Sequence, residues 1–431
     1  MIARCEIPSS PPLNKGGAAR FSAIGWMVGL LALLTAPLLA YGQQHSHHHG
    51  DETIEVSGPP QLQHSRVPSA TFDKNGRLWL AWFYGSYLYV NHSDDLGKTF
   101  SAPVAVNPEP EKFHQNGEAR PKIAVDGDGR IFVAYTQSLP RRYTGNIRFS
   151  RSLDGGKSFT PPVTVNDNLD IISHRFVSMV LDDQGKIHFV WLDGRDFAAA
   201  KKAGRPYDGS ALYYATSNDH GETISANIKL ADYTCQCCRI AMALNREQRP
   251  VMLWRHVFKN ESTGDTSRDH AVMTLSENGQ AGEMRRVSFQ NWSADVCPHH
   301  GPTLAIDSKD RYHMAWFNQV QGKGGLYYAH SDDQGKTVSP VFAFASKDQA
   351  QHPYLAVVDE TVSLVWKSFD GKLTKIHLLR SNDRGDHWGK EAVIASTAGE
   401  SDHPFLLQYD GRLFVSWYSS DEGYRLIEVK Q

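Results

Sequence analysis

The stretch SDDLGKTF, residues 93–100, is the first of five copies of one short pattern, Ser-x-Asp-x-Gly-x-x-apolar. The Asp carboxylate of such a pattern accepts hydrogen bonds from nearby backbone N–H groups, and the Gly supplies the positive φ that a tight turn needs. The last side chain then packs beneath the turn. The pattern therefore predicts a locked hairpin turn that recurs along the chain. The other copies are SLDGGKSF (152–159), SNDHGETI (217–224), SDDQGKTV (331–338) and SNDRGDHW (381–388).

A second series of segments repeats in step with these turns, and it consists of alternating strands such as LWLAWF (78–83) and LFVSWY (413–418). Each strand carries one large aromatic at the same register, and successive aromatics lie 50 to 63 residues apart. This spacing leaves room for four short strands per unit, which is typical of β-propeller blades. We expect the aromatics to be structural wedges between blades. They are Trp82, Tyr135, Trp191, Trp254, Trp316, Trp366 and Trp417.

The number of aromatic strands favours seven blades, and a ring of six blades with an extra hairpin stays open as an alternative. The final unit, residues 403–429, supplies only three strands before the chain ends. The segment TIEVSG (53–58) is available as the fourth strand, which would close the ring and remove an exposed edge. We therefore expect an all-β fold in which residues 54–431 form one propeller of four-stranded blades.

The first 42 residues are typical of a signal peptide. Lys15 and Arg20 precede the apolar run AIGWMVGLLALLTAPLLAYG (23–42), which ends in small residues before an expected cut after Gly42. A membrane anchor is the alternative, because the run approaches spanning length. With cleavage, the mature protein is expected to be periplasmic or secreted, with no stable membrane span. Residues 43–53 then form a His-rich flexible leader, which either collects Cu²⁺ or Zn²⁺ or is simply polar.

The repeated turn is the Asp box, and the chain resembles the sialidase-like Asp-box (BNR-repeat) β-propellers over nearly all of its exported length. Within that superfamily it is similar to a cysteine-containing subgroup without assigned activity. The resemblance implies that the Asp-box aspartates are scaffold, on the face away from the sialidase active site. It also implies a role for Arg66 in HSRVP (64–68), because sialidases use an arginine there to clamp the substrate carboxylate.

Two departures from the sialidase pattern argue against a competent sialidase. The loop FYGSYLYVNH (83–92) contains no carboxylate, although the family has its acid/base residue shortly after the first arginine. In the late blades, QHPYLAVVD (351–359) and DHPFLLQYD (402–410) stand where the family has its remaining arginine and its tyrosine. Tyr354 is present, but no Glu partner is evident. Without the acid and the clamp, glycoside hydrolysis lacks both proton transfer and substrate positioning.

The entrances to the seven innermost strands carry most of the candidate binding residues. In propellers of this kind these strands start near the central axis, so we expect their side chains to meet at one pore mouth. The entrances SRVP, EARP, SHRF and CCRI each contain an arginine, which suits a bound anion, and each of the next three contains a histidine. The candidate anion-binding residues are Arg66, Arg120, Arg175 and Arg239, and the entrance histidines are His300, His352 and His403.

The cysteines lie at two neighbouring entrances, in YTCQCCRIAMAL (233–244) and DVCPHHGP (295–302). In an exported protein, one disulfide between Cys297 and a cysteine of the triplet is the default, whereas two bridges would be strained because Cys237 and Cys238 are adjacent. Thiolates left over from one bridge, together with imidazoles, suit copper or zinc. The candidate metal ligands are therefore Cys235, Cys237, Cys238, Cys297, His299, His300, His352 and His403.

Carboxylates for acid–base chemistry are few in the loops expected on the same face. Asp193 and Asp196 flank Arg195 in the loop after Trp191, and together with Tyr354 they are the weak catalytic candidates. The alternative for the two aspartates is a turn that an internal ion pair with Arg195 holds in place.

The formal net charge of −2 gives no basis for electrostatic capture of nucleic acid. The sequence favours an exported binding module with a Cys/His/Arg-lined central funnel. This funnel is expected to bind a copper or zinc ion, a small anionic or glycan ligand, or another exported protein. The alternative is a divergent exo-sialidase or another glycoside hydrolase.

Overall fold

The computed structural model describes residues 58–430 except 261, 294–298, 321 and 346–348. This part of the chain contains 27 β-strands, the α-helix α1 (Arg195–Lys202) and the short 3-10 helix η1 (Leu62–His64). The expected signal peptide, the His-rich leader, the closing strand near Thr53 and Cys297 lie outside the described residues. Among the described residues, no helix is both long enough and apolar enough to span a bilayer.

The strands form antiparallel sheets in which neighbours in sequence are mostly neighbours in space. The first sheet contains β1 (Arg66–Phe72), β2 (Leu78–Tyr84), β3 (Tyr87–Ser93) and β4 (Val104–Ala105). The second contains β5 (Lys122–Val125), β6 (Ile131–Ser138), β7 (Gly145–Ser152) and β8 (Val163–Thr164). A larger sheet contains β9 (His174–Leu181), β10 (Ile187–Asp193), β11 (Ser210–Ser217), β12 (Ile228–Thr234), β13 (Ala241–Leu244), β14 (Pro250–Lys259), β15 (Thr266–Thr274) and β16 (Arg285–Arg286).

Three more sheets follow along the described chain. One contains β17 (Thr303–Ile306), β18 (Tyr312–Val320), β19 (Lys323–Ser331) and β20 (Phe342–Ala345). The next contains β21 (Gln351–Val358), β22 (Thr361–Phe369), β23 (Thr374–Ser381) and β24 (Ala392–Thr397), and the last contains β25 (Phe405–Tyr409), β26 (Arg412–Ser419) and β27 (Gly423–Val429). The larger sheet consists of two four-stranded meanders, which are joined where Thr234 of β12 pairs with His256 of β14.

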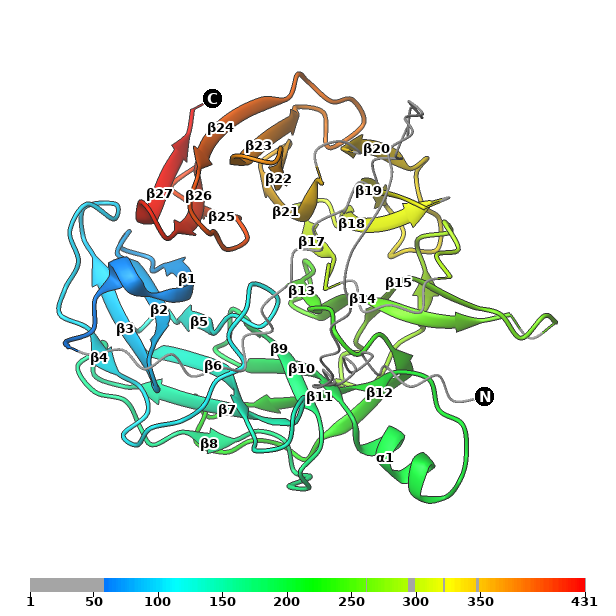
Figure 1. The fold of residues 1–431 in the computed structure, drawn as a ribbon, viewed down its shortest axis with the longest axis horizontal. Coiled ribbons are helices and arrows are strands. Elements are labelled where there is room, and N and C mark those ends of the chain that lie inside the picture. The colour runs from blue at the N-terminus through cyan, green and yellow to red at the C-terminus, as the bar shows by residue number, and fades with distance from the viewer. Residues whose placement is uncertain (1–57, 261, 294–298, 321, 346–348, 431) are drawn as a thin grey trace, which may run out of the picture. The chain divides into compact units, whose positions relative to one another are not determined.

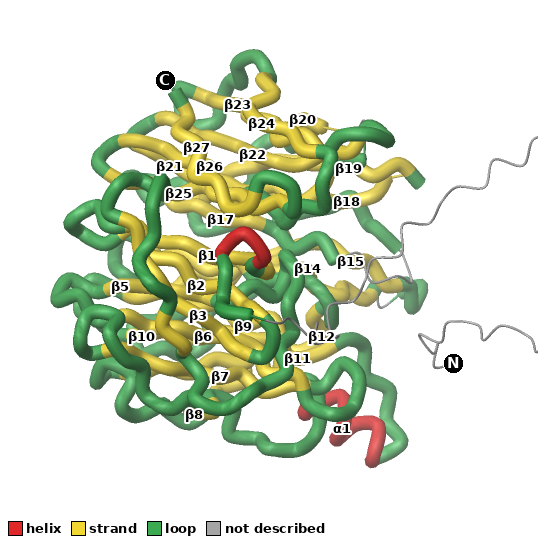
Figure 2. Tube along the Cα trace, turned by 60° about the vertical axis from the view of Figure 1, so that its left-hand side comes forward, coloured by secondary structure: helices red, strands yellow, loops and turns green. Residues whose placement is uncertain are grey.

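The meanders follow one another around a common centre (Figure 1). The first strand of each meander contacts the first strand of the next, from β1 through β5, β9, β13, β17 and β21 to β25, and β25 in turn contacts β1. Figure 2 shows the same strands from another side as successive layers, with α1 next to β11. The described residues therefore adopt a β-propeller-like all-β fold.

The predicted aromatics lie in the second strand of each meander, and each is at most 1 % exposed. Trp82 shares a hydrophobic cluster with Phe405, which joins the first sheet to the last. Tyr135 shares another cluster with Trp79, which joins the first sheet to the second. These contacts fit the expected structural role, because a large aromatic ring buries much apolar surface between two faces.

The Asp boxes form the turns that the sequence predicts. Thr99 and Lys98 donate their backbone N–H groups to Asp95 Oδ1 at 2.8 and 3.1 Å, and Gly97 has a φ of 83°. Ser93 Oγ donates to Asp95 Oδ1 and accepts from the Gly97 N–H, both at 2.8 Å. The donors, the Thr99 N–H first, lower the pKa of Asp95 to about 2. Equivalent turns surround Asp154, Asp219, Asp333 and Asp383.

Candidate functional site

A buried carboxylate, Glu118, lies at the meeting point of three meanders. It is 3 % exposed and lies in the segment before β5. Its Oε2 accepts hydrogen bonds from the backbone N–H groups of Arg239 (3.0 Å) and Gly301 (2.7 Å), and the Arg239 Nη1 donates to its Oε1. A side chain at position 301 would collide with that of Arg239, so glycine permits this close approach. Hydrogen bonds to this one carboxylate therefore connect the segments that precede β5, β13 and β17.

Two imidazoles adjoin the same carboxylate, and a third adjoins one of them. The Nδ1 atoms of His352 and His403 lie 3.4 and 3.5 Å from Glu118 Oε1, and the two rings stack with centroids 3.3 Å apart. His300 Nδ1 lies 3.3 Å from His352 Nδ1. His352 sits at a register shift in β21, where its φ is 53°. We call Glu118, His352 and His403 the axial group, because one donor atom from each lies within 4.8 Å of the other two.

Burial sets the charge state of the axial group. It lowers the pKa of His352 to about 3 and that of His403 well below its usual value. Burial also opposes ionisation of Glu118, but Arg239 and His352 hold its pKa well below the usual range. At neutral pH the group therefore presents one carboxylate and two neutral imidazoles, which are the forms that bind a metal ion.

Arg120 contacts the segment that carries His403, residues 402–405. Its Nη2 donates to the backbone oxygen of His403 at 2.8 Å and lies 3.5 Å from Asp402 Oδ2, and its guanidinium lies 4.8 Å from the centre of the Phe405 ring. Burial raises the pKa of Asp402 to about 6, although Arg120 favours the charged carboxylate.

A cavity of about 190 Å³ adjoins the axial group. Its lining combines cationic and aromatic side chains, including Arg120, Lys122, Arg239, Tyr354 and His403. Burial, together with the nearby charges of Arg120 and Arg239, lowers the pKa of Lys122 to about 7. Two permanent guanidinium charges and a titrating amine therefore face one small space, which favours a small anion.

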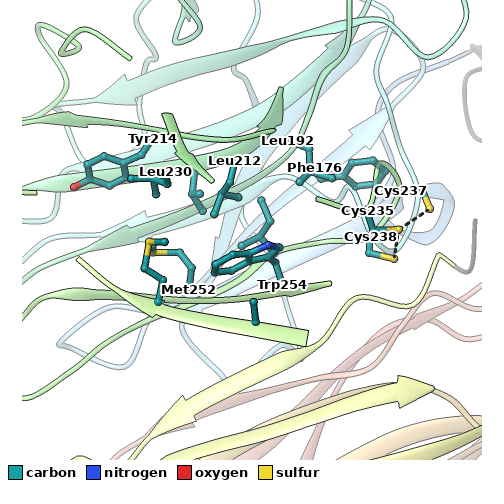
Figure 3. Close-up of a cluster of buried hydrophobic side chains, with 14 of the residues drawn as sticks. Phe176, Leu192, Leu212, Tyr214, Leu230, Cys235, Cys237, Cys238, Met252 and Trp254 are labelled. Carbon is teal, nitrogen blue, oxygen red and sulfur yellow. Dashed lines mark hydrogen bonds between the residues drawn. The ribbon is translucent and has the colours of Figure 1, made fainter. Parts of the chain in front are cut away.

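The three described cysteines, Cys235, Cys237 and Cys238, form a second cluster, which we call the sulfur group (Figure 3). Each is at most 2 % exposed. Cys235 Sγ lies 3.8 Å from Cys237 Sγ and 3.9 Å from Cys238 Sγ, and Arg268 Nη1 donates to it at 3.3 Å. Cys235 and Cys238 are free thiols.

The environments of the two free thiols differ. The hydrogen bond from Cys238 and the charges of Arg268 and Arg255 lower the pKa of Cys235 to about 6, although burial opposes its ionisation. Burial raises the pKa of Cys238 well above its usual value, and the neighbouring Cys235 sulfur adds to this effect. In this pair, Cys235 is the sulfur that ionises first.

The sequence analysis expected the sulfurs and the imidazoles in one pocket, whereas the described donor atoms form two groups, one of sulfurs and one of Glu118, His352 and His403. The sulfurs pack into a hydrophobic cluster with Phe176, Leu192 and Trp254 (Figure 3). Arg239 follows Cys238 directly, and its guanidinium turns to Glu118. The side chains of the adjacent residues Cys238 and Arg239 therefore lie in an apolar and a polar environment, respectively. His299, with a φ of 51°, belongs to neither group, and Cys297 lies outside the described residues.

Two of the four candidate arginines line the described cavity. Arg120 and Arg239 line the cavity, whereas Arg66 and Arg175 are absent from its described lining. Arg66 is exposed at the start of β1. Arg175 donates to Ser173 Oγ at 3.1 Å, and its guanidinium lies over the rings of Tyr143 and Phe176. The entrance register places the backbone of each arginine but leaves the direction of its side chain open.

Asp193 and Asp196 are held in structural contacts. Asp193 is fully buried and accepts from Arg195 Nε at 3.0 Å and Nη2 at 2.9 Å. Asp196 accepts from the Tyr213 hydroxyl at 2.9 Å and pairs with Lys229 at 3.1 Å. Asp193 matches the alternative of a turn held by an ion pair with Arg195, whereas Asp196 pairs with Lys229 instead. Tyr354 is the one catalytic candidate of the three that lines the described cavity.

Sequence reasoning missed Glu118 and Lys122, although Glu118 begins the entrance EARP (118–121) and Lys122 follows it. A signal for Glu118 was available, because a carboxylate two residues before Arg120 stood in the same entrance register as the candidate arginines and histidines. Lys122 gave no comparable signal, since lysine on a strand is ordinary at a surface.

Comparisons with known proteins show the fold alone. No family model and no curated protein matches the chain. A solved protein of unknown function from Dyadobacter fermentans DSM 18053 shares 18 % identity over 75 % of this chain and 95 % of its own, with a TM-score of 0.51. A PL25 ulvan lyase, solved bound to -[GlcA(1-4)Rha3S]-, shares 12 % identity over 88 % of this chain and 95 % of its own (TM-score 0.52). The polysaccharide lyase Uly1 shares 8 % over 89 % and 92 % (TM-score 0.54).

Proposed function

We propose that this protein is an exported binding module that holds one zinc or copper ion in the axial group. Glu118, His352 and His403 are the ligands, and His300 stands beside them. The observation that carries the proposal is that these three residues, from three separate segments, each offer a donor atom within 4.8 Å of the other two, with both Nδ1 atoms within 3.5 Å of Glu118 Oε1. Carboxylate and neutral imidazole are ligands of choice for Zn²⁺ and Cu²⁺.

The spacing of the donor atoms supports a metal ion. Zinc binds nitrogen and oxygen at about 2.0–2.1 Å, so the donors of a tetrahedral site lie about 3.3–3.4 Å apart. The measured separations from Glu118 Oε1 are 3.4 Å to His352 Nδ1 and 3.5 Å to His403 Nδ1. Among the described residues, His403 Nδ1 is buried without a hydrogen-bond partner, which a bound ion would relieve.

The surrounding groups orient the ligands and set the charge. The Arg239 and Gly301 N–H groups fix the Glu118 carboxylate from behind, which is the usual task of residues around a metal site. Arg120 and Lys122 place positive charge beside the ion, which weakens the binding of a dication alone. We therefore infer that the ion keeps an open position towards the cavity, and that an anionic ligand such as a carboxylate completes the site.

A second candidate function is the cleavage of a carboxylated glycan, which includes the divergent glycoside hydrolase or exo-sialidase considered from the sequence. The cavity supports it with a carboxylate-binding pair, Arg120 and Arg239, and with Lys122 and Tyr354 as groups that can transfer a proton. Two solved proteins with this fold are named as polysaccharide lyases. Release of unsaturated or reducing sugars from polyuronates or sialosides, abolished by Tyr354→Phe, would establish it, and no release would exclude it for these substrates.

Several parts of the proposal rest on sequence. We propose a seven-bladed ring in which a strand near Thr53 joins β27, cleavage after Gly42, a periplasmic or secreted location, and a disulfide between Cys297 and one cysteine of the triplet Cys235, Cys237 and Cys238. A small anionic or glycan ligand or another exported protein is the proposed partner. Intact-mass analysis of the exported protein tests the cleavage, and peptide mapping without reduction tests the bridge. A retained leader or a different cysteine partner would contradict them.

The test of metal binding uses the mature chain without an affinity tag. Because residues 43–53 also contain histidines, the reference protein carries alanine in place of His45, His47, His48 and His49. We expect one zinc or copper ion per chain by elemental analysis, lost in His352→Ala and His403→Ala. The exposed His64 provides a matched control, and His64→Ala is expected to keep the ion. A metal-free reference protein after incubation with Zn²⁺ and Cu²⁺ would overturn the proposal.

A further inference from the structure

Lys122 places a primary amine in the cavity beside the axial group. It begins β5, the first strand of its meander, and it lines the same space as Arg120 and Arg239. The lining also includes the apolar side chains of Met179 and Phe405. An amine in such surroundings is poorly hydrated and lies near two permanent positive charges. Both effects disfavour its protonated form.

The Lys122 amine is available for chemistry. Within the described part of the chain it makes no hydrogen bond and no ion pair. The Glu118 carboxylate is held instead by Arg239 and by two backbone N–H groups. Burial, and then the charges of Arg120 and Arg239, lower the pKa of Lys122 to about 7, although Glu118 favours the charged form. A large fraction of this side chain is therefore a neutral amine at neutral pH.

The groups around the amine suit one class of ligand. A neutral lysine amine beside cationic side chains is a nucleophile towards carbonyl carbon. The guanidinium groups of Arg120 and Arg239 are donors that match a carboxylate. The Tyr354 hydroxyl makes no hydrogen bond to the described residues and lines the same cavity, so it can exchange a proton with a bound ligand. One cavity therefore contains a nucleophile, a carboxylate-binding pair and a proton donor.

We propose that the cavity is a covalent binding site for a small carbonyl compound that carries a carboxylate, such as a keto acid, and that Lys122 is the point of attachment. The Lys122 nitrogen attacks the carbonyl carbon, the π electrons of the C=O bond move to the oxygen, and a proton passes from nitrogen to that oxygen. The resulting hydroxyl leaves as water with a proton that Tyr354 donates and then recovers from the nitrogen. Amine and carbonyl become imine and water, so no oxidant or reductant is consumed.

The charge and size of the cavity define the ligand. Its volume of about 190 Å³ limits the ligand to a small molecule. A carboxylate gains the attraction of Arg120 and Arg239, whereas an uncharged carbonyl compound does not. The inference goes beyond the proposed metal site, because the amine reacts without an ion.

The experiment traps the imine by reduction. The native mature chain is incubated with pyruvate and sodium cyanoborohydride at pH 7.5, which converts an imine to a stable secondary amine, and is then digested and mapped by mass spectrometry. At this pH only about one in a thousand ordinary lysine amines is neutral. We therefore expect label on Lys122 to form about tenfold faster, or more, than label on the exposed Lys74.

A second lysine provides a matched control inside the same chain. Lys367 is half-buried like Lys122, but it donates to the backbone oxygen of Ser401 at 3.1 Å and is absent from the described lining of the cavity. We expect it to be labelled as slowly as Lys74. Unfolding the chain in urea is expected to abolish the preference for Lys122.

Three variants test the separate groups. Lys122→Arg keeps the positive charge and is expected to remove the fast label. Arg120→Gln is expected to slow labelling by pyruvate about tenfold and to leave labelling by its uncharged methyl ester unchanged. Tyr354→Phe is expected to slow imine formation about tenfold at saturating pyruvate.

Label on Lys122 that forms no faster than label on Lys74 in the folded chain would overturn the proposal. Equal rates for pyruvate and its methyl ester would overturn the requirement for a carboxylate. The comparison of lysines within one unsubstituted chain depends on no variant that must fold. Metal content is a separate readout, so a metal-free protein that still forms the Lys122 imine contradicts the axial metal site alone.

Discussion

The axial group and the sulfur group are both buried clusters of metal-ligand residues, but they are built in opposite ways. The axial group draws Glu118, His352 and His403 from segments far apart in sequence, which meet because the meanders surround one centre. The sulfur group comes from four consecutive residues, 235–238. Tertiary structure therefore creates the first cluster, whereas local sequence creates the second.

The surroundings of the two groups differ as much as their origins. The axial group adjoins a cavity with cationic walls, where a ligand can enter and meet charge. The sulfur group is packed among Phe176, Leu192 and Trp254 and is absent from the described lining of that cavity. Both groups contain metal-ligand residues, so their environments, rather than their residue types, distinguish them.

The largest expected effect is on the axial group. Glu118→Ala leaves Arg239 and the Gly301 N–H buried without their partner, and breaking a buried ion pair in this way costs about 3–5 kcal/mol. Urea unfolding followed by tryptophan fluorescence measures this loss. The exposed Glu360 provides the control, and Glu360→Ala is expected to leave the unfolding midpoint unchanged. A loss below about 1 kcal/mol for Glu118→Ala would show that the carboxylate is not central to the fold.

The second-largest expected effect is a loss of folding stability at acidic pH, which we attribute to His256 beside the sulfur group. Burial lowers the pKa of His256, on the strand beside Cys235, from 6.5 to about 4, and Arg286 adds to this effect. Because the unfolded chain binds the proton more readily, this stabilisation is fully present above pH 6.5 and is lost as the pH falls through 4. His256→Gln should reduce the acid-induced loss by on the order of 3 kcal/mol. If the free energy of unfolding of the unsubstituted protein and that of His256→Gln depend on pH in the same way, His256 is not the group responsible.

Metal removal distinguishes the two groups directly. At a zinc concentration 100 times the dissociation constant, a bound ion stabilises the folded state by about 2.7 kcal/mol. We expect EDTA to lower the melting temperature of the reference protein and of Cys235→Ser alike, and to leave that of His352→Ala unchanged. An EDTA effect that disappears in Cys235→Ser would instead assign the ion to the sulfurs.

The smallest expected effect is on anion binding, and it distinguishes Arg120 from Arg66. Arg120 lines the cavity and Arg66 does not, so Arg120→Ala is expected to weaken binding of glucuronate, used as a probe anion, by about tenfold, equivalent to 1.4 kcal/mol. Arg66→Ala is expected to change it by less than twofold. Isothermal titration calorimetry measures both, and equal losses would show that the cavity lining does not define the anion site.

Features repeated along the sequence were predictable. The Asp boxes and the wedge aromatics recur at one register, so the turns around Asp95 and its equivalents and the burial of Trp82 were read from spacing alone. The entrance register also indicated that His300, His352 and His403 lie near one another. Position in a repeat fixes where a backbone lies, and this information was sufficient for these features.

Features that depend on side-chain direction were not predictable. Arg239 and Cys238 are adjacent in sequence, but the guanidinium turns to Glu118 and the sulfur to the apolar cluster. The direction of each side chain depends on partners from other meanders. For Arg239 the partner is Glu118, whose carboxylate also accepts from the N–H of Gly301. For the same reason, Arg66 and Arg175 share the entrance register with Arg120 but not its position on the cavity.

The central claim is that segments from separate meanders assemble one metal site at the axial group. Anomalous diffraction at the zinc edge, from crystals of the mature protein grown with one equivalent of Zn²⁺, tests it most directly. The account predicts one peak about 2.0–2.1 Å from Glu118 Oε1 and from the Nδ1 atoms of His352 and His403. A peak at Cys235 and Cys238, or none beside Glu118, would contradict it.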